Sequence, residues 1–383
     1  MRTRAAVIFG VGRDWEVVDV DLDDPGPGEV LVRTRAAGLC HSDEHIVQGD
    51  MTPPEELIAE AGMESPFPMI GGHEGSGEVV AVGDGVRRVA VGDHVAVSFF
   101  PTCGDCHYCV TGRQNLCDKG AQAFLPGMIT DGRRAHRLAD GTPADPVLKL
   151  GTFAEHMLLA EDSVVRVEPD VPFTPAALVS CAVATGWGSA VRRADVRPGD
   201  TVVVVGTGGV GMNAVQGAAM AGARHVVAVD LVEWKRERAD TFGATHTAAS
   251  MDEAMPLVQQ LTRGRGADAV ILVPGLMTGD LVAPALAMTA KGGTVVVTAI
   301  ANIMANEVSM SLFDLAMSQK QVQGTVFGAC NPRTDIPELL GLYTDGRLRL
   351  DELVTTTYSL DEINQGYQDM RDGRNLRGVI TFD

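Results

Sequence analysis

The feature that most constrains the fold is a glycine-rich turn between a run of valines and an alanine-rich segment. Residues Asp200–Val205 read as a strand buried on both faces, and Met212–Ala221 read as a helix. The turn between them is Gly206-Thr207-Gly208-Gly209-Val210-Gly211, and a second valine-rich strand leads to Asp230. A strand, a glycine-rich turn, a helix and an acid about 20 residues further on are typical of a dinucleotide-binding unit. The sequence therefore predicts a doubly wound parallel sheet.

The glycines of this turn indicate how a dinucleotide would bind. Without side chains in the way, the cofactor pyrophosphate can rest on backbone amides at the N-terminus of the helix. Asp230 would accept hydrogen bonds from the adenosine ribose hydroxyls and repel a 2′-phosphate, which favours NAD over NADP. The predicted cofactor-binding residues of the turn are Gly206, Gly208, Gly209, Val210 and Gly211.

The chain length and the strand patterns around the turn indicate two domains. The 383 residues exceed what one simple core usually holds. More strand-like runs follow the turn at residues 269–273, 293–297 and 322–327. Short strand patterns separated by proline and glycine fill the region before it. We expect a Rossmann domain over residues 183–326 and a β-rich domain over residues 1–182, with residues 327–383 packing back onto it.

The charge balance and the lack of targeting signals exclude several classes of partner. A formal net charge of −19 opposes binding to nucleic acids, which need a basic face, and to anionic membrane surfaces. The first eight residues lack the apolar core of a signal peptide, and we expect no stretch long and apolar enough to span a bilayer. The sequence predicts no nucleic-acid partner, no membrane association and a cytoplasmic location.

Four of the seven cysteines lie within fifteen residues, at Cys103, Cys106, Cys109 and Cys117. In a cytosolic protein such crowding favours a metal over disulfides. Four thiolates can close a tetrahedral cage around zinc, and a closed cage leaves no position for a substrate. An iron–sulfur cluster is the competing interpretation, but nothing else in the sequence suggests a partner site for cluster-type redox chemistry. We predict a structural zinc site.

A second concentration of reactive side chains is the run Gly38-Leu39-Cys40-His41-Ser42-Asp43-Glu44-His45. Cys40 could bind zinc as a thiolate, and Asp43 could hold another ligand in place. Ser42 and His45 could pass a proton. A buried cysteine beside a turn is also a common structural feature, so this run alone leaves both interpretations open.

Downstream, His73 and Glu74 are surrounded by glycines in Gly71-Gly72-His73-Glu74-Gly75-Ser76-Gly77. Glycine beside a metal ligand lets the backbone approach closely. Between the two motifs, residues 52–68 form an insert in which Pro53–Glu60 looks like a short helix, because proline and glutamate favour a helix start. The insert is either a surface excursion or a lid over the site.

Taken together, these motifs resemble the zinc-dependent medium-chain alcohol dehydrogenases. Cys40, His73-Glu74, the four cysteines, Cys181 and the glycine-rich turn occur in the order and approximate spacing of that family over essentially the whole chain. Within the family the sequence looks most like the bacterial nicotinoprotein enzymes assayed with N,N-dimethyl-4-nitrosoaniline. The runs that carry this closer match are residues 38–45, 112–118, 185–191 and 359–367. The resemblance implies a GroES-like catalytic domain beside the Rossmann domain.

The resemblance also implies roles for individual residues. Cys40, His73 and Cys181 would bind a catalytic zinc and leave a fourth position for the alcohol or water. Glu74 would lie behind the metal, Asp43 would orient His73, and Ser42 and His45 would relay the alcohol proton. In addition, Phe99 and Trp187 would line the substrate pocket, Thr185 would contact the nicotinamide, Lys235 the adenosine ribose and Arg377 the pyrophosphate.

The implied activity is oxidation of a small-molecule alcohol to an aldehyde or ketone by hydride transfer to NAD. Two zinc ions per chain, one catalytic and one structural, and a tightly bound NAD(H) recycled in place by an external electron acceptor are expected. A homodimer or homotetramer is expected as well. One alternative is a thiol-dependent formaldehyde dehydrogenase, which would need basic residues for the carboxylate of the thiol. The other, from a different class, is a zinc- and NAD-binding protein without turnover.

Overall fold

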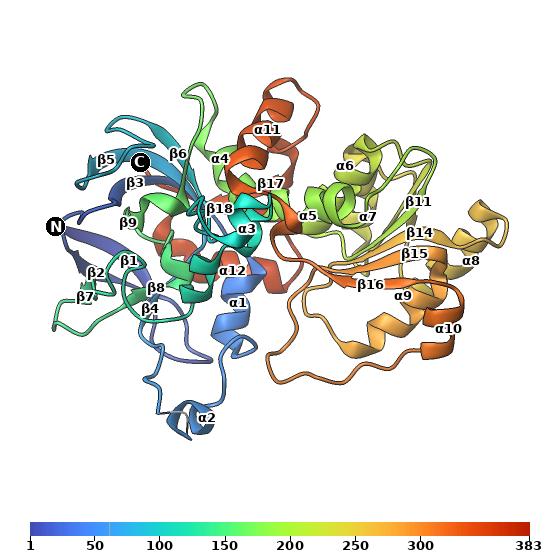
Figure 1. Ribbon diagram of the computed structural model, residues 1–383, viewed down its shortest axis with the longest axis horizontal. Helices are drawn as coiled ribbons and strands as arrows, with labels where there is room; N and C mark the ends of the chain where they lie inside the picture. The colour runs from blue at the N-terminus through green and yellow to red at the C-terminus, as the bar shows by residue number, and fades with distance from the viewer. Residues whose placement is uncertain (61) are drawn as a thin grey trace. The chain divides into compact units, whose positions relative to one another are not determined.

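The chain folds into two units, which the computed structural model describes over residues 1–60 and 62–383. Unit 1 comprises Met1–Cys181 and Asn331–Asp383, and unit 2 comprises Ala182–Cys330. The divisions therefore follow residues 181 and 330, whereas the sequence predicted them at 182 and 326. Figure 1 shows the elements of each unit.

Unit 2 contains the predicted doubly wound parallel sheet. Its six strands run in the order β13-β12-β11-β14-β15-β16, and every neighbouring pair is parallel. The strands are β11 (Thr201–Val205), β12 (His225–Val229), β13 (His246–Ala248), β14 (Ala267–Leu272), β15 (Thr289–Val297) and β16 (Gln321–Gly324). The helices are α5 (Ala184–Gly188), α6 (Gly209–Met220), α7 (Glu233–Arg238), α8 (Met251–Thr262), α9 (Val282–Met288) and α10 (Leu312–Met317).

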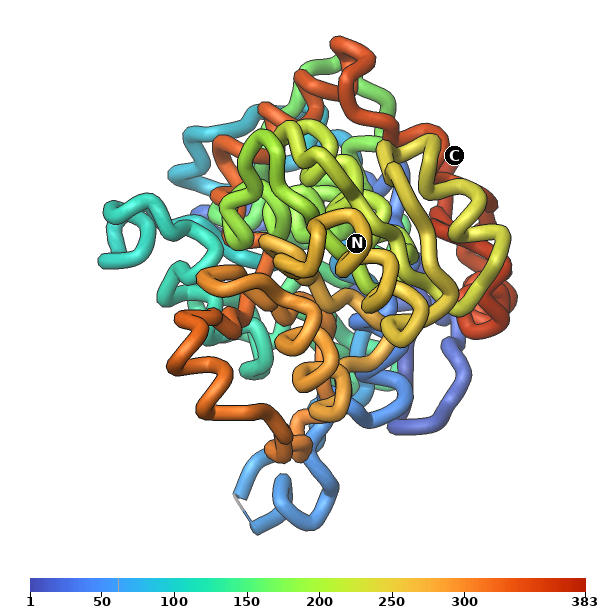
Figure 2. The backbone as a smooth tube through the Cα atoms, turned by 90° about the vertical axis from the view of Figure 1, so that its right-hand side faces the viewer, coloured from blue at the N-terminus to red at the C-terminus, as the bar shows by residue number. Residues whose placement is uncertain are grey.

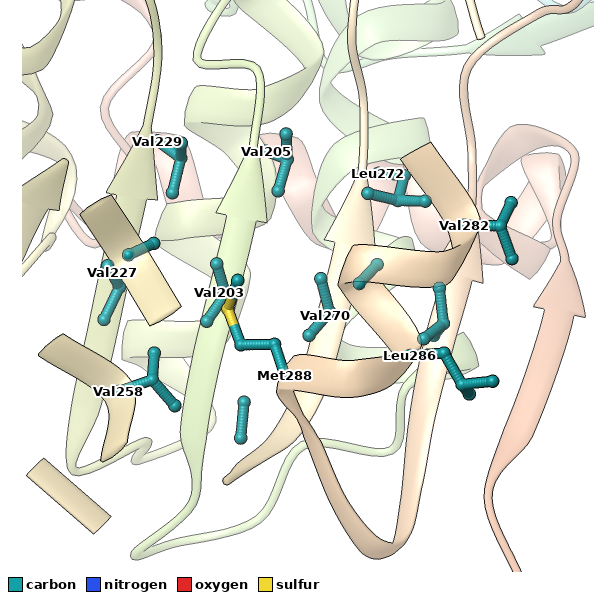
Figure 3. Packing of buried hydrophobic residues seen from close by; sticks show 14 of the residues in the cluster. Val203, Val205, Val227, Val229, Val258, Val270, Leu272, Val282, Leu286 and Met288 are labelled. Atoms are coloured by element: carbon teal, nitrogen blue, oxygen red, sulfur yellow. The ribbon is translucent and has the colours of Figure 1, made fainter. Parts of the chain in front are cut away.

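Alternation along the strands explains how both faces of this sheet are covered. Val203 and Val205 point to the face where α8 and α9 pack, and their side chains join one buried cluster (Figure 3). Val204 points to the other face, where a Cβ at Gly211 in α6 would come 3.7 Å from its Cγ1. Each fully buried valine or leucine side chain contributes about 1.5–3 kcal/mol. The sheet is thus a rigid base for the turn between β11 and α6.

Unit 1 is built from two mainly antiparallel sheets. One has the order β7-β2-β1-β4-β8, and the other β10-β6-β5-β3-β18-β17 with β9 also paired to β3. The strands are β1 (Arg2–Ile8), β2 (Glu16–Leu22), β3 (Glu29–Gly38), β4 (Met69–Ile70), β5 (Glu74–Val82), β6 (His94–Val97), β7 (His136–Leu138), β8 (Asp145–Pro146), β9 (His156–Ala160), β10 (Val164–Arg166), β17 (Val354–Tyr358) and β18 (Arg377–Thr381). The helices are α1 (His41–Gln48), α2 (Glu55–Glu60), α3 (His107–Val110), α4 (Phe173–Leu178), α11 (Pro332–Thr344) and α12 (Ile363–Arg371).

The C-terminal part of unit 1 completes a sheet begun near the N-terminus. Strand β18 is antiparallel to β3, with Val379 opposite Gly38 and Ile380 opposite Ala37. Strand β17 adds to β18 in parallel. The end of β3 leads directly into the run that begins with Cys40, so β18 supports the segment that carries the reactive side chains.

The insert of residues 52–68 forms the predicted short helix, here α2, whose bounds are Glu55–Glu60. None of the helix residues is buried, and in both views the segment projects away from the strands of unit 1 (Figures 1 and 2). Ala61 lies outside the described residues. The lid remains a prediction.

One sequence expectation needs correction. Phe173–Arg193 is a helical run of 21 residues that is long and apolar enough to cross a bilayer. However, 78% of its most apolar window is buried inside the structure. The run is therefore a core helix, because its apolar side chains pack against protein. Hydropathy alone does not separate the two cases.

Candidate metal and cofactor sites

The four clustered cysteines come together as a metal site. Their ligand atoms all lie within 4.8 Å of one another. The Sγ atoms of Cys103 and Cys109 are 3.8 Å apart, those of Cys106 and Cys117 are 3.9 Å apart, and those of Cys117 and Cys103 are 3.6 Å apart. Sulfurs at about 2.3 Å from one zinc ion in a tetrahedron are separated by about 3.8 Å. The spacing fits a single zinc and is far too long for disulfides.

A charged network fastens this cysteine lobe, residues 103–117, to the rest of unit 1. Asp162 is 2.5 Å from Arg88, 2.6 Å from Lys119 and 3.3 Å from Arg333. Burial would raise the pKa of Asp162, but hydrogen bonds from Lys119 and Arg88 outweigh it and lower the pKa. Arg88 also donates to the carbonyl of Cys103. Sequence reasoning missed this network, because its members are scattered along the chain.

A second cluster, the Cys40 cluster, consists of Cys40, His73, Glu74 and Cys181. All four residues are buried, and their ligand atoms lie within 4.8 Å of one another. Cys40 lies between β3 and α1, and Glu74 is the first residue of β5. Cys181 lies in a π-helical stretch, Val179–Val183, and such wide turns often occur at functional sites.

The chemistry of these donors indicates a cation. A hydrogen bond from Cys181 and the nearby His73 hold the pKa of Cys40 well below its ordinary value. Burial opposes this shift but is outweighed. The same hydrogen bond, together with burial, raises the pKa of Cys181. Without a positive ion, one thiolate therefore forms at the expense of the other. A cation between the two sulfurs would allow both to be thiolates in this buried site. Two thiolates and an imidazole are the ligand types that zinc prefers, so the residues present fit this metal.

Asp43 orients the imidazole of the cluster. Its Oδ2 is 3.0 Å from His73 Nδ1, and its Oδ1 accepts a hydrogen bond of 3.1 Å from the backbone N–H of Gly72. Asp43 and His73 are both buried. A carboxylate at Nδ1 directs Nε2 toward the metal position, which is the usual arrangement behind a metal-bound histidine.

Glu74 forms a buried ion pair with Arg377 on β18. Burial raises the pKa of Glu74 to about 8, although the Arg377 charge opposes this shift. A Cβ at Gly38 would lie only 2.3 Å from Glu74 Oε2, so the pair requires glycine there. The structure thus places Arg377 against Glu74, whereas the resemblance implied a contact with the pyrophosphate; that contact remains a prediction.

The two predicted relay residues lie on α1. Ser42 Oγ is 3.7 Å from Cys40 Sγ, so the hydroxyl borders the cluster. His45 is buried, and its Nδ1 is 3.0 Å from Asp50 Oδ2. The helix ends at Gln48, and the left-handed φ of 86° at the following Gly49 turns the chain so that Asp50 comes back to His45. Sequence reasoning missed Asp50, although a glycine after the helix was a signal of such a turn.

The two predicted pocket residues lie in different units. In unit 1, the ring of Phe99 stands edge-to-face with His73, with ring centroids 5.6 Å apart, so it borders the Cys40 cluster. In unit 2, Trp187 lies on α5, and the guanidinium of Arg192 is 5.9 Å from its ring centroid. Thr185 is half-buried on the same helix.

The glycine-rich turn of unit 2 has the geometry of a phosphate-binding loop. Gly206 has a φ of 92°, and a Cβ there would lie 2.2 Å from the carbonyl oxygen of Val273. At Gly211 a Cβ would lie 1.8 Å from the carbonyl oxygen of Gly206, so both glycines serve close packing. At Gly208 a Cβ would meet nothing within 4 Å, which leaves room for a ligand at the start of α6. Gly209 and Val210 form the first turn of that helix.

The acid that follows β12 lies beside this turn. Asp230 accepts hydrogen bonds from the backbone N–H groups of Thr207 and Val232. Lys235 on α7 is half-buried; burial lowers its pKa, and Asp230 opposes this shift. A glycine-rich turn, a helix N-terminus and a carboxylate after the next strand are the elements needed to hold a dinucleotide.

Comparison with known proteins points in one direction. Residues 26–169 match the family model described as alcohol dehydrogenase GroES-like domain, and residues 209–345 match zinc-binding dehydrogenase. Putative alcohol dehydrogenase D of Mycobacterium tuberculosis is 51% identical over 382 residues, with 100% of both chains covered. The NDMA-dependent alcohol dehydrogenase of Amycolatopsis methanolica is 48% identical over 380 residues, with 99% of both covered. The crystal structure of benzyl alcohol dehydrogenase from Acinetobacter calcoaceticus matches with a TM-score of 0.89 and 29% identity, with 100% of both chains covered.

Proposed function

The chain belongs to the zinc-dependent medium-chain alcohol dehydrogenase family, and on that premise we propose that its NAD stays bound and is reoxidised in place during alcohol oxidation. The chain is an alcohol dehydrogenase, an oxidoreductase that acts on small-molecule alcohols. The observation that carries the catalytic assignment is the buried Cys40 cluster, which offers two thiolates and an oriented imidazole to one metal ion. The retained cofactor is supported by 48% identity to the NDMA-dependent enzyme.

In this proposal Cys40, His73 and Cys181 hold a catalytic zinc, and the cysteine lobe holds a structural one. When bound, the catalytic zinc supplies Lewis acidity that lowers the pKa of the alcohol, and NAD supplies a hydride acceptor. Asp43 fixes His73, while Arg377 holds Glu74 in place behind the cluster. Phe99 beside His73 gives the pocket an apolar wall.

The same proposal assigns the alcohol proton to α1. Ser42 borders the Cys40 cluster and takes the proton first, and His45 passes it outward. Asp50 orients the imidazole of His45, because its carboxylate is 3.0 Å from Nδ1. Asp50 is an addition to the relay that the sequence implied.

Retention of the cofactor has a direct test. After extensive dialysis, the protein is expected to release close to one NAD(H) per chain on denaturation, as measured by mass spectrometry. It is also expected to oxidise an alcohol with N,N-dimethyl-4-nitrosoaniline as acceptor and no added NAD. A dialysed protein that carries no nucleotide and turns over only with added NAD would contradict the proposal. The same assay with and without glutathione separates it from a thiol-dependent formaldehyde dehydrogenase, whose activity needs the thiol.

We also propose that the chain forms a homodimer through unit 2. Within the described residues, β16 pairs only with β15, so one edge of the sheet has unpaired backbone groups. The preceding helix α10 exposes large apolar side chains, which is unusual for a surface in water. These are Leu312, Phe313 and Met317, with Ile303, Met304 and Val308 in the segment before the helix. A second copy can cover them by pairing its own β16 edge-to-edge.

Phe313→Glu is expected to convert the dimer to a monomer of 40.4 kDa, because a carboxylate would be buried without a partner. Light scattering after size-exclusion chromatography gives the mass directly. The matched control is Val91→Glu in unit 1, since Val91 is 63% exposed and Phe313 is 77% exposed. If the two variants elute with the same oligomeric mass, the α10 surface is not the interface.

None of the seven cysteines, all of which lie in the described residues, forms a disulfide. We therefore propose a cytoplasmic location, where a reducing environment keeps both thiolate sites able to bind zinc.

A further inference from the structure

Thr207, the second residue of the glycine-rich turn, makes an interaction that the fold alone does not require. Its side chain is fully buried. Its Oγ1 donates a hydrogen bond of 3.1 Å to Asp230 Oδ2, and its backbone N–H donates one of 2.7 Å to the same oxygen. The turn after β11 is therefore tied to the end of β12 through one carboxylate.

Other bonds hold Asp230 from the remaining sides. The backbone N–H of Val232 donates to Oδ1 at 2.9 Å, and Asp230 donates its own N–H to the carbonyl of Ala248 at 3.2 Å. Arg236 Nη1 donates to the Asp230 carbonyl at 2.8 Å. The carboxylate itself has three donors, which are the N–H and hydroxyl of Thr207 and the N–H of Val232. Because a carboxylate has about four lone-pair positions, capacity for a ribose hydroxyl remains.

The hydroxyl of Thr207 can be separated from the rest of this network. The backbone of the turn is set by Gly206, whose N–H donates to the Val229 carbonyl and whose φ is positive. Thr207 N–H would thus reach Asp230 with any side chain at this position. Only the O–H bond depends on the residue being threonine or serine.

Two cations lie beside Asp230, and both are already engaged: Lys235 is half-buried and interacts with Asp230 itself, and Arg236 is held by backbone oxygens. A 2′-phosphate needs a cation beside the ribose, but the guanidinium of Arg236 donates to the carbonyl oxygens of Asp230 and Leu231. At the end of β12, a ligand therefore meets the oriented carboxylate of Asp230, while the guanidinium of Arg236 stays hydrogen-bonded to backbone oxygens.

We propose that Thr207 is a positioning residue for cofactor specificity: its hydroxyl orients the Asp230 carboxylate for the adenosine ribose hydroxyls and so sets the preference for NAD over NADP. This inference rests on the proposed use of NAD. The donors on both carboxylate oxygens fix the direction of the remaining lone pairs, which favours the acceptance of ribose hydroxyls and places the carboxylate against a 2′-phosphate.

The test compares Thr207→Val, which has a similar shape and no hydroxyl, with Thr207→Ser, which keeps the donor. Each protein is stripped of nucleotide with charcoal, and NAD and NADP binding are measured by titration calorimetry. Thr207→Val is expected to weaken NAD binding by about 5–20-fold and NADP binding less than twofold, while Thr207→Ser stays within twofold of wild type for both. Thermal melting of each variant checks folding, and Thr207→Ala replaces the valine variant if valine prevents it.

A double-mutant cycle shows whether the effect passes through the carboxylate. In an Asp230→Asn background, Thr207→Val is expected to change NAD affinity by less than twofold, because the oriented anion is already gone. An equal loss in both backgrounds, or equal affinities for the valine and serine variants, would overturn the proposal. If the wild-type protein binds neither nucleotide, the proposed function fails first, and that failure is distinguishable because it needs no variant.

Discussion

Replacing Cys181 by alanine is expected to remove one zinc ion per chain and to lower kcat by at least about 1,000-fold. Cys181 is one of two thiolates in the Cys40 cluster, and a site left with one thiolate and one imidazole holds zinc poorly. The fold should survive, because the change removes one small side chain from a helix already packed in the core. Zinc per chain by mass spectrometry and turnover with an alcohol are the two measurements.

The chain offers a matched control for this experiment. Cys330 is also buried and outside any disulfide, but it belongs to neither metal cluster of the described residues. Cys330→Ala should keep both zinc ions and near-normal turnover. If Cys181→Ala retained full activity, or lost no more zinc than the control, the catalytic assignment of the Cys40 cluster would be wrong.

Cys109→Ser is expected to have the opposite signature, with the loss of the other zinc ion and a melting temperature lower by roughly 10 °C. Of the four cysteines in the lobe, Cys109 lies nearest the middle of the segment. Residues 103–117 contain little regular structure that could persist without the metal. Chemistry at the Cys40 cluster does not involve this thiol, so the folded fraction should retain its catalytic zinc. Calorimetric melting and zinc analysis are the readouts.

The serine variant has its own reference in Cys330→Ser, which introduces the same hydroxyl at a buried thiol without touching a cluster. If the Cys109→Ser protein still bound two zinc ions and had the same melting temperature as Cys330→Ser, a structural zinc in the lobe would be ruled out. The two cysteine experiments together assign each zinc ion, because each variant loses one and keeps the other.

Local patterns explain why some of these features could be predicted from the sequence. The turn Gly206–Gly211 and the lobe Cys103–Cys117 each fit in a short segment whose spacing is set by backbone geometry. Cys181 has no such local signal, and only the family resemblance placed it beside Cys40. In the structure these two residues meet because α4, which begins the helical run that contains Cys181, packs against β3, which leads into Cys40.

Contacts between distant residues account for what the sequence did not reveal. Glu74 and Arg377 are 303 positions apart, and Arg333 reaches Asp162 across 171. A single sequence contains no signal for such pairs, because any acid can in principle meet any base. The apolar run Phe173–Arg193 shows the same limit, since its burial depends on neighbours that hydropathy does not describe.

The sheet formed by β3 and β18 also determines the order in which the protein can mature on the ribosome. Arg377, which holds Glu74 in place, and the strand that supports the segment before Cys40 are translated only after all of unit 2. Unit 2 is continuous in sequence and can therefore fold while synthesis proceeds, whereas unit 1 stays open at β3 until its last strand emerges. Cys40, His73 and Cys181 all precede unit 2 and β18 in the chain. We expect the catalytic metal to be enclosed as a late, post-translational event.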